Sequence, residues 1–225
     1  MITRSLAGMP TRDTRDESII AHFSDGLLMH FAKDETIIEG FDEPEGIYLI
    51  KEGFVKAYSV SQAGHGNLLL IHEAGEFMPL PWALDGAHTT GLSYAAMNDV
   101  TVLRTSKDAL RKAMGSNAWL SQEILKQAVD IITIYTKRIQ ILEFRSARGR
   151  IIAELLYLAE RFGKQVGSEI LINAPITHQD IADSINMNRE TASRALELLF
   201  EEKLMGQNDH LFSVRDLPKL QKALS

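Results

Sequence analysis

Residues 176–205 read ITHQDIADSINMNRETASRALELLFEEKLM, and the pattern in this stretch decides the fold of the C-terminal part of the chain. Thr177 can cap a helix, with Asp180 three positions on as in a variant of the capping box. Asn188 can cap a second helix, and a short turn that begins at Asn186 separates the two. Two short helices joined by such a turn predict a helix-turn-helix.

The second helix of this motif, from Arg189 to about Glu201, carries its polar side chains on one face. At about 100° per residue they fall within an arc of roughly 140°, opposite Ala192, Ala195 and Leu199. The polar residues are Arg189, Glu190, Ser193, Arg194 and Glu197. Arginine can bind guanine through two acceptors and glutamate can accept from cytosine N4, so the face suits base edges in a major groove. A solvated surface is the alternative, but the capped first helix, the short turn and the small alanines favour DNA binding.

Two flanking segments extend the motif. Glu169 to Ile172 is strand-like and residues 204–212 read as a hairpin with a polar tip, which together predict a winged module. Upstream, Arg145 to Arg150 holds three positive charges and leads into the helical spacing of Ile151 to Phe162. We place a domain boundary at this basic segment.

A long helix is predicted before the boundary, because no Pro or Gly occurs from Ser116 to about Phe144. Two rows of residues in it each repeat every seven positions and are offset by three, as in the seam of a coiled coil. The rows are Leu125, Ile132 and Ile139, and Ala128, Tyr135 and Leu142. The spacing predicts a dimer interface; a long helix packed on its own domain is the alternative.

Residues 31–105 contain short β-prone runs with turn residues at close intervals, which predicts an antiparallel barrel, roll or sandwich. Examples are Ile47 to Ile50, Phe54 to Tyr58 and Val100 to Leu103. The apolar stretch 77–84 could line an effector pocket or form a rigid lid. Packing of the β-domain against the long helix is the favoured interpretation, because clustered apolar residues are usually core.

Composition limits the chemistry. The 225 residues are 45% hydrophobic and 24% charged and include no cysteine, which excludes a disulfide, a thiolate nucleophile and a cysteine-held iron–sulfur cluster. No apolar run approaches the roughly 20 residues of a membrane span, and the start has no apolar signal-peptide core, so a cytoplasmic protein is expected. The net charge of −6 arises entirely in residues 1–144, which hold 13 basic and 19 acidic residues. This asymmetry suggests two functions in one chain.

The chain resembles the catabolite activator (cAMP receptor protein) and fumarate–nitrate regulator superfamily of bacterial transcription factors over about residues 20–215. The most specific part is Ile176 to Ala182 followed by Asn188 to Arg194. Its R-E-T-x-x-R core is similar to the cAMP branch, and its E-T-x-S-R core is similar to the fumarate–nitrate branch. The resemblance implies a homodimer that reads an inverted repeat with half-sites about one helical turn apart. RNA polymerase is a further implied partner.

The resemblance also assigns candidate DNA contacts. Bases would be read by Arg189, Glu190, Ser193 and Arg194. Thr177 and Gln179 stand where the family touches phosphate, and His178 stands where the cAMP branch carries a basic residue.

In the β-domain, residues 46–53 and 75–77 resemble the conserved turns of the family's cyclic-nucleotide roll. In nucleotide-binding members a Gly-Glu pair is followed by Arg-Ser; the arginine neutralises the cyclic phosphate and the glutamate holds the ribose. Here no arginine occurs between Lys56 and Arg104, and a buried phosphate without a cation is costly, so cAMP is not expected. The candidate effector-binding residues are Gly75, Glu76, Thr89 and Thr90.

The sequence therefore predicts an α+β chain with an N-terminal antiparallel, cyclic-nucleotide-binding-like β-roll (1–115), a long dimerisation helix (116–144) and a C-terminal winged helix-turn-helix (145–225). We predict a DNA-binding regulator, either switched by an effector other than cAMP or independent of ligand. The cofactor is left open, with haem on a histidine as one option. The histidines considered are His22, His30, His65, His72 and His88.

An enzyme is the second class of function considered. A β-roll with histidines could bind a metal as cupins do, but His65 and His72 are seven apart and form no His-x-His pair with a nearby Glu. Neither a catalytic residue nor a metal ligand set is predicted.

Overall fold

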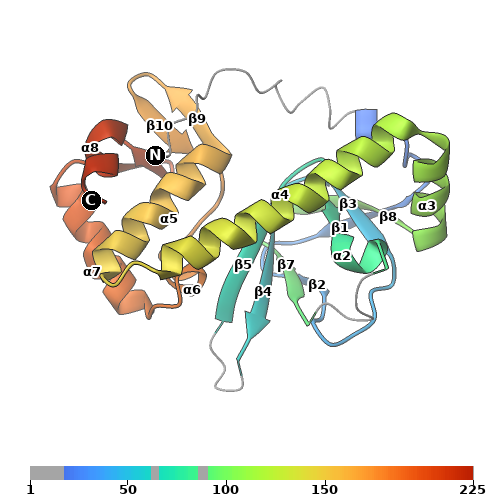
Figure 1. Cartoon of the computed structure of the whole chain (residues 1–225), viewed down its shortest axis with the longest axis horizontal. Helices are drawn as coiled ribbons and strands as arrows, with labels where there is room; N and C mark the ends of the chain where they lie inside the picture. Colours follow the sequence, from blue (N-terminus) through green and yellow to red (C-terminus); the bar gives the residue numbers. More distant parts are fainter. Residues whose placement is uncertain (1–17, 62–65, 86–90, 225) are drawn as a thin grey trace.

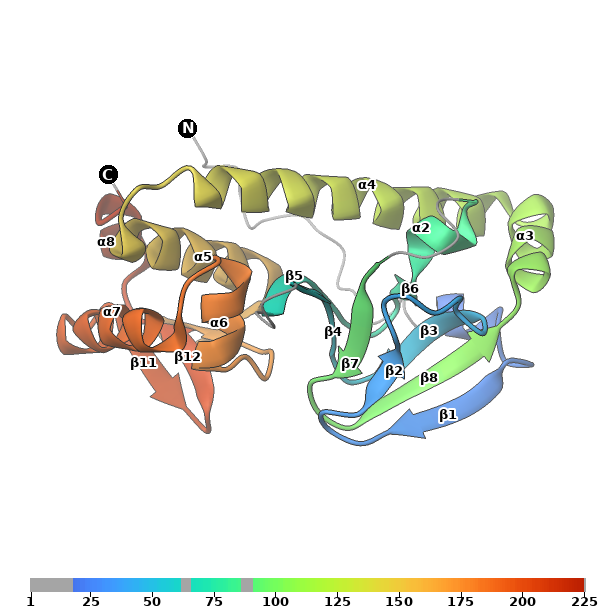
Figure 2. The same cartoon turned by 90° about the horizontal axis from the view of Figure 1, so that it is seen from below.

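The computed structural model describes residues 18–61, 66–85 and 91–224. Its N-terminal strands form two four-stranded antiparallel sheets, β1-β8-β3-β6 and β2-β7-β4-β5, which face each other (Figure 2). The strands are β1 (Leu27–Phe31), β2 (Thr36–Ile38), β3 (Ile47–Glu52), β4 (Val55–Val60), β5 (Gly66–His72), β6 (Phe77–Met78), β7 (Ser93–Ala96) and β8 (Val100–Thr105). The predicted antiparallel roll is confirmed.

Strand β3 shows how the roll is built. Side chains alternate between the two faces of a strand. Tyr48 and Ile50 point into the core between the two sheets, whereas Ile47 and Leu49 point to a second core under the helices. Both faces of the strand are therefore covered from Ile47 to Ile50, which explains the apolar run there.

The second core joins the roll to helices α2 (Leu80–Ala83), α3 (Lys107–Ser116) and α4 (Ala118–Leu142). Phe77, Leu80 and Trp82 are buried there, packed with the first turns of α4. Most of the apolar stretch 77–84 is thus core, as the favoured interpretation of the sequence had it, whereas Pro81 and Leu84 are exposed.

Helix α4 is the long rod in Figure 1 that leaves the roll and ends beside α5. It is two residues shorter at each end than the predicted 116–144. The helical conformation is interrupted at Asn117, where the extended backbone ends α3. The Asn117 side chain then caps α4 by accepting a hydrogen bond from the Leu120 amide at 3.1 Å. Sequence periodicity alone did not reveal this cap.

The C-terminal part packs three helices against a small sheet and a final helix. The order of the sheet is β11-β12-β10-β9. The elements are α5 (Ala147–Phe162), β9 (Gly163–Val166), β10 (Glu169–Ile172), α6 (His178–Ser184), α7 (Arg189–Glu201), β11 (Met205–Asn208), β12 (Leu211–Val214) and α8 (Leu217–Lys222). The predicted second helix, the strand at 169–172 and the hairpin near 204–212 are all present, which confirms the winged helix-turn-helix.

Candidate functional site

The helix-turn-helix is fixed by local hydrogen bonds and one small buried residue. Thr177 and Asp180 form the full reciprocal capping box of α6, and Asn188 Oδ1 accepts from the Thr191 amide at 2.8 Å to cap α7. Between the helices, Asn186 has a left-handed φ of 52°, a conformation that Asn tolerates. Ala192 is fully buried where the two helices meet. These features orient α7 with its N-terminus free.

The outer face of α7 carries the predicted base-reading residues. Arg189, Glu190 and Arg194 are exposed, and Ser193 is half-buried beside them. Glu190 and Arg194 form an ion pair at 3.3 Å in which both side chains are at least three-quarters exposed. Such a pair contributes little to stability, so both groups can exchange partners for base edges at small cost.

His178 lies behind this face and supports it. Its Nδ1 is 3.0 Å from the Ser193 hydroxyl, and its ring stacks on Phe212 of the wing at 5.5 Å between centroids. Burial, with a further contribution from the Arg189 charge, holds the pKa of His178 below its ordinary value. The neutral ring therefore joins α6, α7 and the wing.

The two candidate phosphate contacts lie at the start of α6. Thr177 and Gln179 are both exposed. The Thr177 hydroxyl is 2.6 Å from Asp180, and the Gln179 amide donates to Asp183 at 2.7 Å. Both side chains are held in place by carboxylates of the same helix.

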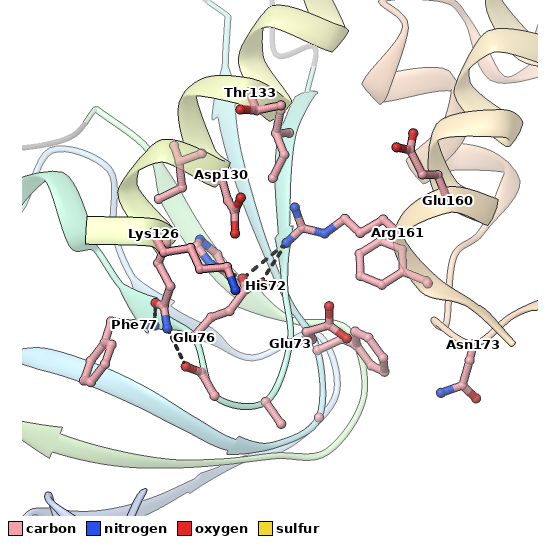
Figure 3. A pocket seen from close by; sticks show the side chains of 18 of the residues that line it. His72, Glu73, Glu76, Phe77, Lys126, Asp130, Thr133, Glu160, Arg161 and Asn173 are labelled. Atoms are coloured by element: carbon pink, nitrogen blue, oxygen red, sulfur yellow. Dashed lines mark hydrogen bonds and ion pairs between the residues drawn. The ribbon is translucent and has the colours of Figure 1, made fainter. Parts of the chain in front are cut away.

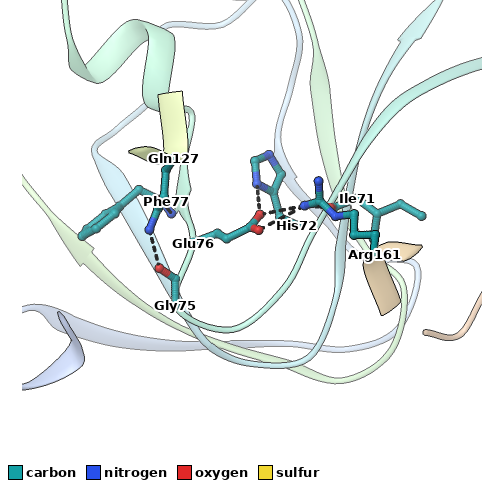
Figure 4. A network of polar contacts seen from close by, with 7 residues as sticks. All are labelled: Ile71, His72, Gly75, Glu76, Phe77, Gln127 and Arg161. Carbon is teal, nitrogen blue, oxygen red and sulfur yellow. Dashed lines mark hydrogen bonds and ion pairs between the residues drawn. The ribbon is translucent and has the colours of Figure 1, made fainter. Parts of the chain in front are cut away.

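The other candidate site is the turn between β5 and β6. Gly75 has a φ of 82°, which favours glycine. Gln127 of α4 holds both sides of this turn, donating to the Gly75 carbonyl at 2.8 Å and accepting from the Phe77 amide at 3.1 Å. Between them, Glu76 points away from Gln127 toward His72 and Arg161 (Figure 4). The long helix is thus bonded directly to the predicted effector turn.

Glu76 is paired with the C-terminal domain. Arg161 of α5 approaches its two carboxylate oxygens at 3.0 and 3.2 Å, and His72 Nδ1 lies 3.0 Å from one of them. These residues line a cleft of about 880 Å³, which we call the interdomain cleft. Figure 3 shows its walls, with the roll below, α4 above and α5 opposite. Thr89 and Thr90, the other candidate effector residues, lie outside the described residues.

A second arginine, Arg138 of α4, is buried where three parts of the chain meet. Its Nε donates to the Leu69 carbonyl of β5 at 2.6 Å. Its Nη1 donates to the Ser184 carbonyl of α6 at 3.2 Å and faces Glu154 of α5 at 3.4 Å. The roll, the long helix and the DNA-binding domain therefore share one cation.

The predicted dimer seam divides into two rows. Leu125, Ile132 and Ile139 are 64–65% exposed. Ala128 and Tyr135 are half-buried, and burial raises the pKa of the Tyr135 hydroxyl. Leu142 at the end of that row is exposed, as is Val129, which the sequence analysis did not include. An apolar stripe along α4 is thus uncovered in the single chain.

The histidines considered for haem have ordinary hydrogen-bonding partners where they are described. His22 Nδ1 lies 2.7 Å from the Ser18 carbonyl, and His30 Nδ1 lies 3.1 Å from the Thr101 hydroxyl. His65 and His88 fall outside the described residues. Within residues 18–61, 66–85 and 91–224, no group of three or more His, Asp or Glu side chains is placed to hold a metal ion. In the same part of the chain, no helix combines the length and apolar character needed to cross a membrane.

A β-roll, a long helix and a winged helix-turn-helix with two exposed arginines on the outer face of α7 define a DNA-binding regulator. Residues 28–117 match the model of the cyclic nucleotide-binding domain, and residues 149–223 match that of the Crp-like helix-turn-helix domain. The chain belongs to the catabolite activator and fumarate–nitrate regulator superfamily of transcription factors, which confirms the identification made from the sequence.

Individual relatives are distant. A CRP-like cAMP-activated global transcriptional regulator of Mycobacterium tuberculosis is 26% identical over 166 residues, 74% of each chain. A global nitrogen regulator of Nostoc sp. is 27% identical over 176 residues, 78% of this chain and 79% of the relative. Among solved structures, a CooA variant from Carboxydothermus hydrogenoformans has a TM-score of 0.78 at 21% identity, over 99% of this chain and 98% of that one. FixK2 from Bradyrhizobium japonicum has a TM-score of 0.74 at 20% identity, over 89% and 98%.

Proposed function

We propose that the chain acts as a homodimer that reads an inverted repeat in DNA and regulates transcription, with RNA polymerase as a further partner. The observation that carries this proposal is the outer face of α7, where Arg189, Glu190 and Arg194 are exposed at the free N-terminal end of a capped helix. In a helix-turn-helix this end reaches the base edges, and arginine is the residue that most often reads guanine. Thr177, His178 and Gln179 would position α6 on the phosphates, and Ser193 would complete the reading face.

The first test is selection from a randomised DNA pool at a stated salt concentration, since salt alone changes such affinities by orders of magnitude. We expect enrichment of an inverted repeat by the wild-type protein. The variant Arg189→Ala/Arg194→Ala should lose the sequence preference. As a matched control, Lys219→Ala/Lys222→Ala removes two charges from α8 of the same domain. It should weaken binding without changing the selected sequence. A preference that survives in the α7 variant would refute the assignment.

The dimer is supported by the uncovered stripe on α4. Ile132 lies at its middle and is 65% exposed. The variant Ile132→Asp would bury a charge at the centre of the interface, so we expect a monomer by sedimentation velocity. Thr133→Asp is the matched control, because Thr133 lies on the side of α4 that lines the interdomain cleft. Dimerisation that survives Ile132→Asp would exclude this seam.

For the roll, Gly75 and Glu76 are the described residues that would contact an effector. The alternative of a ligand-independent regulator is supported by the engagement of Glu76 with Arg161. Thermal-shift measurements against a metabolite set, with Glu76→Gln as the matched variant, distinguish the two. A ligand that stabilises the wild type and not the variant would support an effector at this turn.

A further inference from the structure

The DNA-binding domain is docked on the free edge of one roll sheet. Strand β5 is the last strand of the order β2-β7-β4-β5, so its outer carbonyls have no strand partner. Two of them accept from arginines outside the roll: Arg138 donates to Leu69, and Arg161 donates to Ile71 at 2.8 Å. Leu69 is the extra residue of a bulge opposite β4, which leaves its carbonyl free for this bond. The edge of the sheet is thus capped by guanidinium groups.

Arg161 is the arginine that the DNA-binding domain itself contributes. Its side chain is only 9% exposed, although the roll and α5 are separate parts of the chain. The same Nη2 that bonds Ile71 lies between the two oxygens of Glu76, and Nε is buried without a hydrogen-bond partner. A guanidinium buried to this extent depends on its carboxylate partner. The position of α5 against the roll therefore depends on Glu76.

The turn that holds Glu76 is at the same time bonded to α4. Gln127 bonds the residues on either side of Glu76, as described above. A ligand that donated hydrogen bonds to the Glu76 carboxylate would have to displace Arg161 from it. Displacement would leave the buried Arg161 cation without its carboxylate, and the docked arrangement would lose the ion pair between α5 and the roll.

We propose that the Glu76–Arg161 ion pair is a latch between the roll and the DNA-binding domain. The latch is closed when Arg161 pairs with the Glu76 carboxylate, and it is opened by any group that binds this carboxylate in place of Arg161. The inference rests on the proposed function, because it concerns the regulation of the DNA-binding domain. It gives the candidate effector turn a second role as the docking point of that domain. Ligand contact at Glu76 and closure of the latch exclude each other.

The test measures docking without DNA. The chain has no cysteine, so Thr36→Cys on the roll and Gln221→Cys on the DNA-binding domain, both exposed, give two specific spin-label sites. Labelled chains are mixed with an excess of unlabelled chains, so that each dimer carries one labelled pair. Double electron–electron resonance then reports the distance between the domains. The wild type should give one narrow distribution.

The variants Arg161→Gln and Glu76→Gln should each raise a second population by on the order of tenfold or more, because the first removes the cation that joins α5 to the roll and the second leaves that buried cation without its carboxylate. The double variant should open the latch no further than the single ones, since the two side chains act through one contact. Glu160→Gln is the matched control: Glu160 is the neighbour of Arg161 and lines the same cleft, but it pairs with Lys137 of α4 at 2.7 Å and not with the roll. Its distribution should equal that of the wild type.

Three results would overturn the latch. Arg161→Gln could give the wild-type distribution, the two single variants could have additive effects, or Glu160→Gln could open the domains equally. Should Arg161→Gln not fold, Glu76→Gln tests the same pair from the other side, and an unchanged distance distribution in it would also count against the latch. Since no DNA is present, loss of sequence-specific binding and loss of docking are read as separate results.

Discussion

Replacing Arg138 by methionine tests whether one buried cation holds the three parts of the chain together. The side chains of Arg138 and Glu154 are 6% and 1% exposed, and they lie 3.4 Å apart. Methionine fills much of the space of the arginine stem but cannot donate a hydrogen bond. The change leaves the Glu154 carboxylate buried without its cation. It also removes the donors to Leu69 and Ser184.

The magnitude follows from these contacts. Removing one partner of a buried ion pair costs about 3–5 kcal/mol. The Ser184 carbonyl, which loses its donor in a buried setting, adds about 1 kcal/mol, whereas Leu69 is half-exposed and its carbonyl can be hydrated. We expect a loss of roughly 4–6 kcal/mol in the free energy of unfolding of the docked chain. For a chain of this size this corresponds to a fall in Tm of roughly 8–24 °C.

The assay is differential scanning calorimetry with two further variants. Arg138→Met/Glu154→Leu removes both charges and should be more stable than the single variant, because no buried charge is left unpaired. Lys137→Gln breaks a neighbouring pair with Glu160 that is partly exposed, and should cost less than about 1 kcal/mol. The reasoning is refuted if Arg138→Met is no less stable than Lys137→Gln, or if the double variant is no better than the single one.

Two further predictions concern the helix-turn-helix. Asn188→Ala removes the side chain that caps α7 and should destabilise the domain by about 1 kcal/mol in urea unfolding, whereas Asn188→Asp keeps an acceptor and should remain near the wild type. Because burial lowers the pKa of His178 in the folded chain, the unfolded chain takes up this proton first as the pH falls below about 6.5. The contribution of His178 to stability should therefore fall as the pH drops from about 6.5 to its lowered folded pKa, and stay reduced below it. His178→Gln should make the urea midpoint of unfolding depend less on pH in this range. An unchanged slope of that midpoint against pH would contradict the prediction.

The elements of the C-terminal domain were predictable because their signals are local. A cap lies within three residues of the amide it satisfies, as Thr177 does for Asp180 and Asn188 for Thr191. Helical periodicity likewise placed Ala192 at the helix crossing before any contact was known. The start of α4 was predicted two residues early, at 116, because that prediction used the absence of Gly and Pro after Gly115 and not the capping side chain of Asn117.

The interdomain contacts were not predictable because they join residues far apart in the chain. Glu76 was recognised as a candidate effector residue, but nothing local indicates that Arg161, 85 positions later, would occupy it. Gln127 was missed for the same reason. One signal was available: Arg138 lies on the inward face of α4, four residues after Ile134 and three before Ile141, both buried. A charge in such a row requires a buried partner, and Glu154 within the apolar run of α5 is a natural candidate.

The arginine-capped edge of β5 also matters for any fragment of this protein that lacks the DNA-binding domain. An open sheet edge is a template onto which a strand from another molecule can add. In the intact chain Arg161 and the helices around it cover the carbonyl of Ile71. A fragment that ended after α4 would uncover this edge, and we expect such rolls to join strand to strand into larger aggregates. The DNA-binding domain therefore also protects the roll from self-association.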